Sequence, residues 1–142
     1  RGMVLDCIVD NVGTGIVVGA HGTVERCAVS RSFKGAGIAA GERSVVRNNR
    51  ATEGGYYDEG EEHYYQPSGI LLTGDGALVT VNYTAENTGY GIDAGAYKVA
   101  AFQNIGSSNL LGNFNGPATD GTAPWSTPTG VINPMANLYY GP

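Results

Sequence analysis

Short apolar runs recur along the chain, and glycine closes each of them. The clearest copies begin with Gly-Ile and continue through small or apolar residues to another glycine, at 15–19, 37–41, 69–74 and 91–95. Their starts are separated by 22, 32 and 22 residues. Runs that alternate with period two and are this short are typical of β-strands rather than helices. The pattern therefore predicts a repeat of 22 residues that is built from short strands.

The rest of each period follows the same alternation. Nine residues after each starting glycine come Val24, Val46, Leu78 and Ala100. Twelve and fourteen residues after it come the pairs Cys27/Val29, Asn49/Ala51, Val81/Tyr83 and Gln103/Ile105, and Leu5/Cys7 fill these positions in a partial first coil. One such unit cannot bury its own apolar side, whereas stacked copies can. We therefore predict an all-β solenoid, a parallel β-helix, over residues 1–113.

Stacking in this register produces inward ladders and outward rows. Two inward ladders would be Ile16, Ile38, Ile70 and Ile92, and Val18, Ala40, Leu72 and Ala94. Between them lies an outward row of Val17, Ala39, Leu71 and Asp93. Exposed apolar stripes usually mark a contact surface. Val17, Ala39 and Leu71 are therefore candidates for an assembly flank.

Two further outward rows bear on catalysis. They would hold Glu25, Arg47, Val79 and Ala101, and Ala28, Arg50, Asn82 and Asn104. Glycoside hydrolysis needs two carboxyls within roughly 5–9.5 Å of each other. No row stacks two carboxylates, so we assign no catalytic residue. Glu25 and Arg47 would be neighbours in an exposed ion pair of little energetic worth.

Asparagine and cysteine also follow the period. Asn82/Asn104 and Asn87/Asn109 recur at 22 residues, and we expect turn chemistry of them because asparagine tolerates the left-handed region. In this register Cys7 aligns with Val29 and Cys27 with Leu5, one step out of stack. Both are expected inside, either as buried thiols or as a disulfide between diagonal neighbours. Two cysteines without a nearby histidine pair predict no metal site.

The ten extra residues in the middle gap belong to an insertion at about 53–67. It contains an acidic, tyrosine-rich run: Tyr56, Tyr57, Asp58, Glu59, Gly60, Glu61, Glu62, His63, Tyr64 and Tyr65. Insertions in solenoids form loops on one face, often the binding face. Tyrosine suits sugar or protein surfaces, and the acids offer oxygen ligands for Ca²⁺. A solvated loop, a protein contact and a glycan or Ca²⁺ site all remain open for this run.

The last part of the chain lacks the repeat. Residues 112–142 hold five of the six prolines and the single tryptophan. We expect residues 114–142 to form an extended tail that packs on the solenoid and caps its last coil, anchored by Trp125, Met135, Leu138 and Tyr139. The first coil has no such cover in this sequence. We expect that either an upstream domain covers it or another copy stacks there, so it is a second candidate contact surface, for another copy or for another protein.

Composition excludes several classes. The chain carries two lysines and six arginines, and its net charge is −5, so nothing suggests the basic face of a nucleic-acid binder. No apolar run approaches the ~20 residues of a membrane span. The 23 glycines and the 15% of charged residues fit a turn-rich, tightly stacked backbone better than disorder. The chain begins at Arg1 without signal-peptide character, and we expect it to be part of something longer.

The Gly-Ile coil starts, Val24–Val29 and Val45–Asn49 together resemble bacterial right-handed parallel β-helix repeat proteins of the pectate-lyase-like superfamily, over about 4–113. The ending Asn-Pro-Met-Ala-Asn at 133–137 is similar to the tail of uncharacterised members. The resemblance implies a right-handed coil and an extracellular or cell-surface location on a bacterium. It is nearly silent on activity, because the superfamily includes lyases, hydrolases, phage fibres and surface proteins.

From these observations we predict a non-catalytic extracellular β-helix module with a structural, adhesive or self-assembling role and no required cofactor. The alternatives are a fragment of a carbohydrate-active enzyme, either a polysaccharide lyase or a glycoside hydrolase, and a glycan-binding phage-type fibre. Polysaccharide is then the expected partner.

Overall fold

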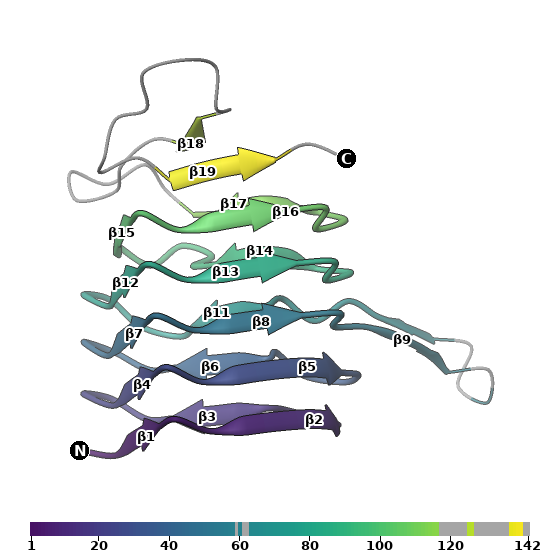
Figure 1. The fold of residues 1–142 in the computed structure, drawn as a ribbon, viewed down its shortest axis with the longest axis horizontal. Coiled ribbons are helices and arrows are strands. Elements are labelled where there is room, and N and C mark those ends of the chain that lie inside the picture. Colours follow the sequence, from purple (N-terminus) through teal and green to yellow (C-terminus); the bar gives the residue numbers. More distant parts are fainter. Residues whose placement is uncertain (59, 61–62, 117–124, 127–136, 141–142) are drawn as a thin grey trace.

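The computed structural model describes residues 1–58, 60, 63–116, 125–126 and 137–140, and these form a stack of coils made of three parallel sheets (Figure 1). Sheet A contains β1 (Met3–Leu5), β4 (Thr23–Glu25), β7 (Val45–Arg47), β12 (Leu78–Thr80) and β15 (Ala100–Phe102). Sheet B contains β2 (Ile8–Val12), β5 (Ala28–Ser32), β8 (Arg50–Thr52), β13 (Tyr83–Ala85), β16 (Ile105–Ser107), β19 (Asn137–Tyr140) and β18 (Trp125–Ser126). Sheet C contains β3 (Ile16–Val18), β6 (Ile38–Ala40), β11 (Ile70–Leu72), β14 (Tyr90–Asp93) and β17 (Gly112–Asn115).

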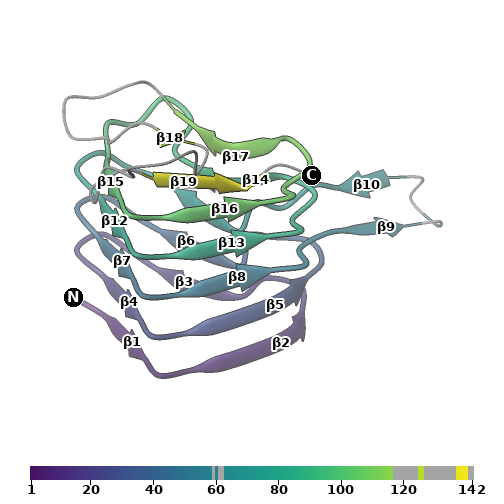
Figure 2. The same cartoon turned by 45° about the horizontal axis from the view of Figure 1, so that its top comes forward.

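The predicted right-handed parallel β-helix is confirmed. In Figure 1 the sheet B strands run from left to right in front and the sheet C strands return behind, while the chain climbs from the N-terminus. Figure 2 shows the three walls of the resulting coil. Every strand pair within the stacked sheets is parallel and joins one coil to the next, as in Ile16↔Ile38 and Ile38↔Ile70.

The core is a set of stacked inward side chains. In sheet C the predicted isoleucine ladder is confirmed, with Ile38, Ile70 and Ile92 fully buried and Ile16 nearly so. The adjacent ladder of Val18, Ala40, Leu72 and Ala94 is buried as well. Because each coil buries its apolar side only against its neighbours, the core is a continuous column along the axis.

The Gly-Ile motif has a steric cause. A Cβ built on Gly15 would lie 2.0 Å from the carbonyl oxygen of Gly37, and one on Gly37 would lie 2.8 Å from that of Gly69. The same atom on Gly69 would lie 2.9 Å from the oxygen of Gly91. The backbones of successive coils therefore approach too closely here for any side chain, and glycine recurs at each coil start.

The predicted register fails in sheets A and B beyond the third coil. In sheet C the paired residues of these two coils are Ile38 and Ile70. In sheet A the paired residues are Val45 and Leu78, which are one residue further apart in the sequence than Ile38 and Ile70. The cause is a longer turn, because residues 41–44 join β6 to β7, whereas residues 73–77 join β11 to β12. A shift of one residue exchanges the two faces of a strand. Val79 is consequently buried (0% exposed) and Leu78 is exposed (38%), the reverse of the prediction.

The same shift corrects the remaining assignments in the last two coils. The prediction is wrong for five residues that it placed inward, which are Ala100, Val81, Tyr83, Gln103 and Ile105. It is also wrong for three residues that it placed outward, which are Ala101, Asn82 and Asn104. The buried residues are Ala101, Asn82, Asn104 and Thr84. Tyr83 and Ile105 instead continue the outward row of Ala28 and Arg50.

The first coil is shorter than the others. Met3 pairs with Thr23 and Ile8 with Ala28, and both intervals are shorter than the predicted repeat. Residues 13–15 join β2 to β3, whereas residues 33–37 join β5 to β6, so the missing residues lie in this turn. The predicted alignments of Cys7 with Val29 and of Cys27 with Leu5 are therefore wrong. Cys7 lies directly beneath Cys27.

The insertion forms an antiparallel hairpin of β9 (Tyr56–Asp58) and β10 (His63–Tyr65), which projects from the side of the coil stack (Figures 1 and 2). We expected a loop in this position. At the C-terminal end, β19 pairs in parallel with β16, and β18 pairs with β19, so the described part of the tail continues sheet B.

Candidate functional site

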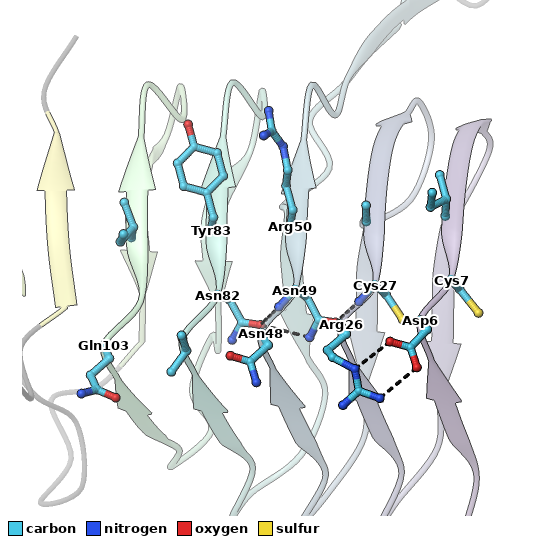
Figure 3. Close-up of a pocket in the computed structure, with 14 residues that line it drawn as sticks. Asp6, Cys7, Arg26, Cys27, Asn48, Asn49, Arg50, Asn82, Tyr83 and Gln103 are labelled. Atoms are coloured by element: carbon cyan, nitrogen blue, oxygen red, sulfur yellow. Dashed lines mark hydrogen bonds and ion pairs between the residues drawn. The ribbon is translucent and has the colours of Figure 1, made fainter.

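A groove of about 630 Å³ follows the corner between sheets A and B, across all five coils (Figure 3). We call it the A–B groove. It is lined by Asp6, Cys7, Ile8, Arg26, Cys27, Ala28, Asn48, Asn49, Arg50, Val81, Asn82, Tyr83, Gln103 and Ile105.

One residue in each coil makes the corner. Asp6, Arg26, Asn48, Val81 and Gln103 all adopt the left-handed conformation, with φ between 53° and 57°. A single left-handed residue ends the sheet A strand and redirects the chain into sheet B two residues later. Their side chains form one side of the A–B groove, and the first residues of the sheet B strands form the other.

The residue after each corner points inward, and from the second coil on it also binds the coil before it. Asn49 accepts a hydrogen bond at Oδ1 from the Cys27 N–H (2.9 Å) and donates from Nδ2 to the Val24 carbonyl (3.0 Å). Asn82 repeats both bonds, to the N–H of Asn49 and the carbonyl of Val46. Asn104 repeats them again one coil later. We call this column, with Cys7 and Cys27 at its N-terminal end, the corner ladder.

The expected left-handed turn role of the asparagines is therefore wrong. They are buried, and the left-handed residue is the one before each of them in the corner ladder. Asn87 and Asn109 form a second ladder at the end of the sheet B strands, where Asn87 Oδ1 accepts from the Gly54 N–H (3.1 Å). Since buried amides that satisfy backbone groups contribute about 1 kcal/mol per bond, the ladders hold the coils in register.

Two charged residues, Asp6 and Arg26, line the N-terminal part of the groove, and Glu25 and Arg47 extend their ion-pair network beside it. The Arg26 guanidinium donates to both carboxylate oxygens of Asp6 (2.6 and 2.8 Å) and to Glu25 (2.8 Å). Arg47 donates to the second oxygen of Glu25 (2.8 Å), which confirms the predicted pair. These arginines hold the pKa values of Asp6 and Glu25 below their usual range. The carboxylates here are thus engaged with arginines rather than presented as a pair.

A second exposed ion pair lies outside the groove. Asp10 accepts hydrogen bonds from Arg31 and from the Ser30 hydroxyl, with an Arg31 Nε distance of 2.8 Å. The Arg31 and Ser30 bonds lower the pKa of Asp10 to about 2. Like Asp6–Arg26, this pair joins the first coil to the second.

The middle of the groove differs in character. The Arg50 guanidinium lies 5.2 Å from the centre of the Tyr83 ring, and in Figure 3 both side chains extend from neighbouring sheet B strands in the same direction. Among the described residues no ion pair neutralises Arg50. Amide side chains of Asn48 and Gln103 lie along the other wall. This part offers one cation, one aromatic face and neutral hydrogen-bonding groups.

The sequence-derived candidates lie elsewhere. Val17, Ala39 and Leu71 are stacked on the outer face of sheet C, followed by Asp93. Val17 is exposed, whereas Ala39 and Leu71 are partly buried. Asp93 accepts from the Asn115 amide (2.8 Å) and from the Gly95 N–H (3.0 Å).

Little of the tyrosine-rich run is described. Glu59, Glu61 and Glu62 lie outside the described residues, and only the backbone is described for Tyr56, Tyr57, Asp58, His63 and Tyr64. Tyr65, at the base of the hairpin, lies against Lys34, whose Nζ is 5.3 Å from the ring centre. Of the proposed tail anchors, Met135 lies outside the described residues, and Trp125, Leu138 and Tyr139 are described as strand backbone only.

The part of the chain that is described holds no group of three or more His, Cys, Asp or Glu side chains arranged to bind a metal. It also contains no helix able to span a membrane.

Sequence reasoning missed the A–B groove because the shifted register placed Tyr83 inside and Asn82 outside. The recurrence of asparagine at 22 residues was the available signal. Comparison of the chain with family models, with curated proteins and with solved structures finds no match.

Proposed function

We propose that the chain is a structural β-helix module that assembles through its first coil, with a second copy as the partner. The proposal rests on the strand pairing of that coil. In the part of the chain that the structure describes, strands β1, β2 and β3 are each paired on one side only, with β4, β5 and β6, and stand at the ends of their sheets. The backbone N–H and C=O groups on the free side of these three strands therefore all face the open end of the stack.

The inward side chains of the first coil support the proposal. Val24, Cys27 and Val29 of the second coil are at most 2% exposed. Their counterparts in the first coil, Val4, Cys7 and Val9, are only partly buried although they pack on the same core. Covering them would continue the column by which every other coil is stabilised.

The free edges of β1, β2 and β3 also lack the features that usually prevent pairing with another strand. Exposed edge strands are normally blocked by lysine, proline, bulges or inward charges. The sequences of β1, β2 and β3 are Met-Val-Leu, Ile-Val-Asp-Asn-Val and Ile-Val-Val, in which Asp10 is the single charged residue. Asp10 is already bound to Arg31. Ile8 (86% exposed) and Met3 (67%) add apolar area beside the edge.

The extracellular setting, the adhesive role and the pectate-lyase-like relationship are part of the same proposal. They rest on the resemblance of the Gly-Ile coils and on the rod-like stack that the fold provides. The apolar flank of Val17, Ala39 and Leu71 is a weaker candidate surface than the first coil, because two of its members are partly buried and its row ends in Asp93.

The test is light scattering after size exclusion over a concentration series. We expect the mass to rise with concentration in the parent chain and to fall back to the monomer in Ile8→Lys and Met3→Lys, since lysine on an edge strand disfavours pairing. Leu110→Lys, at a residue of similar exposure (64%) in the last coil, is the matched control and should assemble like the parent. A monomer at every concentration would sink the proposal.

A second candidate function is binding of an extended glycan in the A–B groove. The specific observation is the Arg50–Tyr83 pair, which presents a cation and an aromatic face beside the Asn48 amide. Aromatic faces with adjacent hydrogen-bonding groups suit sugar rings.

Calorimetric titration tests this candidate with two probes, a neutral glucan oligosaccharide and a uronic-acid oligosaccharide, each with and without Ca²⁺. Binding that is lost in Tyr83→Ala and kept in Val17→Ala would support it. No heat from either probe would remove it, and dependence on Ca²⁺ alone would point away from the groove to other acidic residues.

A further inference from the structure

The corner ladder changes its chemistry at its N-terminal end. The three later coils place an asparagine after the corner residue, and the first two place Cys7 and Cys27 there. Cys27 follows the asparagine geometry: it is buried, and its thiol donates toward the Val4 carbonyl (3.6 Å), as Asn49 donates toward that of Val24. From Cys27 onward, each ladder side chain thus reaches toward the preceding coil.

The hydrogen bonds of the corner ladder do not explain why residue 27 is a cysteine. An asparagine there would make two good bonds to the first coil, whereas the thiol makes only long, weak ones to Val4 and Glu25 carbonyls. A cysteine in this position packs with the apolar core and, unlike asparagine, has a sulfur that can also bond to the residue below. That residue is Cys7.

The geometry permits the bond. The strand pairs on either side of the two cysteines, Met3↔Thr23 and Ile8↔Ala28, share one register without a slip between them, so Cys7 and Cys27 are equivalent positions of adjacent coils. Adjacent strands lie roughly 4.8 Å apart, within the ~4.4–6.8 Å over which Cα atoms are joined by a disulfide. Both cysteines are thiols in this structure.

Closing the bond requires the Cys7 side chain to turn toward Cys27. Figure 3 shows the Cys27 sulfur on the side of the first coil and the Cys7 sulfur turned to the open end. Cys7 is only partly buried and donates a single hydrogen bond, to the Leu5 carbonyl (3.2 Å), so it is free to turn.

We propose that Cys7 and Cys27 are a reversible disulfide site that, when oxidised, joins the first coil covalently to the second. A low-molecular-weight disulfide such as glutathione disulfide is the oxidant. The Cys7 thiolate attacks one of its sulfurs and releases one glutathione thiolate. The Cys27 thiolate then attacks the Cys7 sulfur of the mixed disulfide and releases the second. The protein loses two electrons and two protons, and glutathione disulfide is reduced to two glutathione molecules.

The disulfide would stabilise the coil that is least stabilised by neighbouring coils. Among the described residues the first coil has a neighbouring coil on one side only. Besides its strand pairing and core packing, exposed ion pairs of Asp6 and Asp10 join it to the second coil. Closing the loop of one coil should raise the melting temperature by about 10 °C. Burial raises the pKa of the Cys27 thiol, so the second step is expected to be the slower one.

The experiment treats the native chain with glutathione disulfide, at a concentration where light scattering shows a monomer. Trypsin cuts after Arg26 and Arg31, so the bond would join the peptide 2–26 to the peptide 27–31. We expect that linked pair by mass spectrometry, loss of both thiols, and a rise in melting temperature that dithiothreitol reverses. The assay reads a bond within one chain, so its result is independent of whether coils assemble.

Three variants serve as controls. Cys7→Ser and Cys27→Ser should show no redox-dependent melting shift, and Cys27→Asn, which completes the corner ladder, should stay folded and show none either. The proposal is overturned if both thiols persist in the native chain, if a glutathione adduct on Cys7 accumulates without closing, or if the bond forms between two chains.

Discussion

At each corner between sheets A and B one residue adopts the left-handed conformation, and in the last three coils the next residue is an asparagine that satisfies buried backbone groups. Asparagine and aspartate tolerate the left-handed region best among residues with side chains, and a β-branched residue tolerates it worst. The corner positions hold Asp6, Arg26, Asn48 and Gln103, but the fourth coil holds Val81 at φ 57°. Val81 is exposed, so no core packing offsets its conformation.

We therefore expect Val81→Asn to raise the free energy of unfolding by about 1 kcal/mol, because a left-handed conformation costs a non-glycine residue about 1–2 kcal/mol and asparagine relieves part of it. Denaturant melts of the parent and the variant measure the change. Asn48→Val, the reciprocal substitution one coil earlier, should lower stability by a similar amount. Equal stability of both variants and the parent would show that the corner is not strained.

The Asp10–Arg31 pair predicts a pH dependence of stability. The pKa of Asp10 is lowered to about 2 from an ordinary value of 3.8, so the folded state binds this proton less readily than the unfolded chain. The pair's contribution is complete above about pH 4 to 5 and is lost as the pH falls toward 2. Since the pair is exposed, the effect is modest.

Melting temperatures from pH 2 to 6 test this expectation in the parent and in Asp10→Asn. The parent should melt at the higher temperature near pH 6, and the difference should close as the pH approaches 2. A difference that stays constant over this range would mean that the Asp10 carboxylate contributes nothing through its charge.

At the scale of the strand, face assignment depends on turn length. The Gly-Ile repeat marks sheet C directly, and its ladders and outward row follow correctly from the sequence. Sheets A and B come after a turn whose length differs between coils, since it spans residues 41–44 in one coil and residues 73–77 in the next. The apolar pattern does not change with the length of this turn. Val79 and Leu78 are both apolar, as are Ala100 and Ala101, so composition cannot choose which of each pair is buried.

The A–B groove was unpredictable for the same reason. Its walls depend on which residues after the corner point inward, and the buried role of Asn82 reverses the assignment of Tyr83. The shortened first coil hid the alignment of Cys7 with Cys27 in the same way. In each case the missing information is the backbone geometry of a turn, which the periodic pattern does not contain.

The corrected register can be tested by two neighbouring substitutions. Val79→Asp places an unpaired carboxylate in the core and should unfold the chain or cost more than about 4 kcal/mol of stability. Leu78→Asp, one residue earlier and on the outer face, should cost less than about 1 kcal/mol. Circular dichroism melts compare the two. The opposite order would restore the register predicted from the spacing of the Gly-Ile starts.

At the scale of the whole molecule, the coil stack has two unlike ends. In the part of the chain that the structure describes, β19 and β18 extend the C-terminal end of sheet B, whereas the strands of the first coil are each paired on one side only and its inward side chains are half-buried. The two ion pairs and the proposed disulfide all join the first coil to the second. The molecule therefore reinforces the coil through which we propose that it assembles.

The direction of assembly distinguishes this account from its rivals. Two first coils that pair about a two-fold axis would close as a dimer. The dimer would be longer along the coil axis than one copy. Association through the flank of Val17, Ala39 and Leu71 would instead set two rods side by side.

Small-angle X-ray scattering over a concentration series measures this directly. The account predicts that the maximum dimension increases with concentration while the cross-sectional radius of gyration stays constant, and that Ile8→Lys abolishes the increase. A particle that keeps the dimensions of one coil stack at all concentrations, or one that thickens without lengthening, would contradict it.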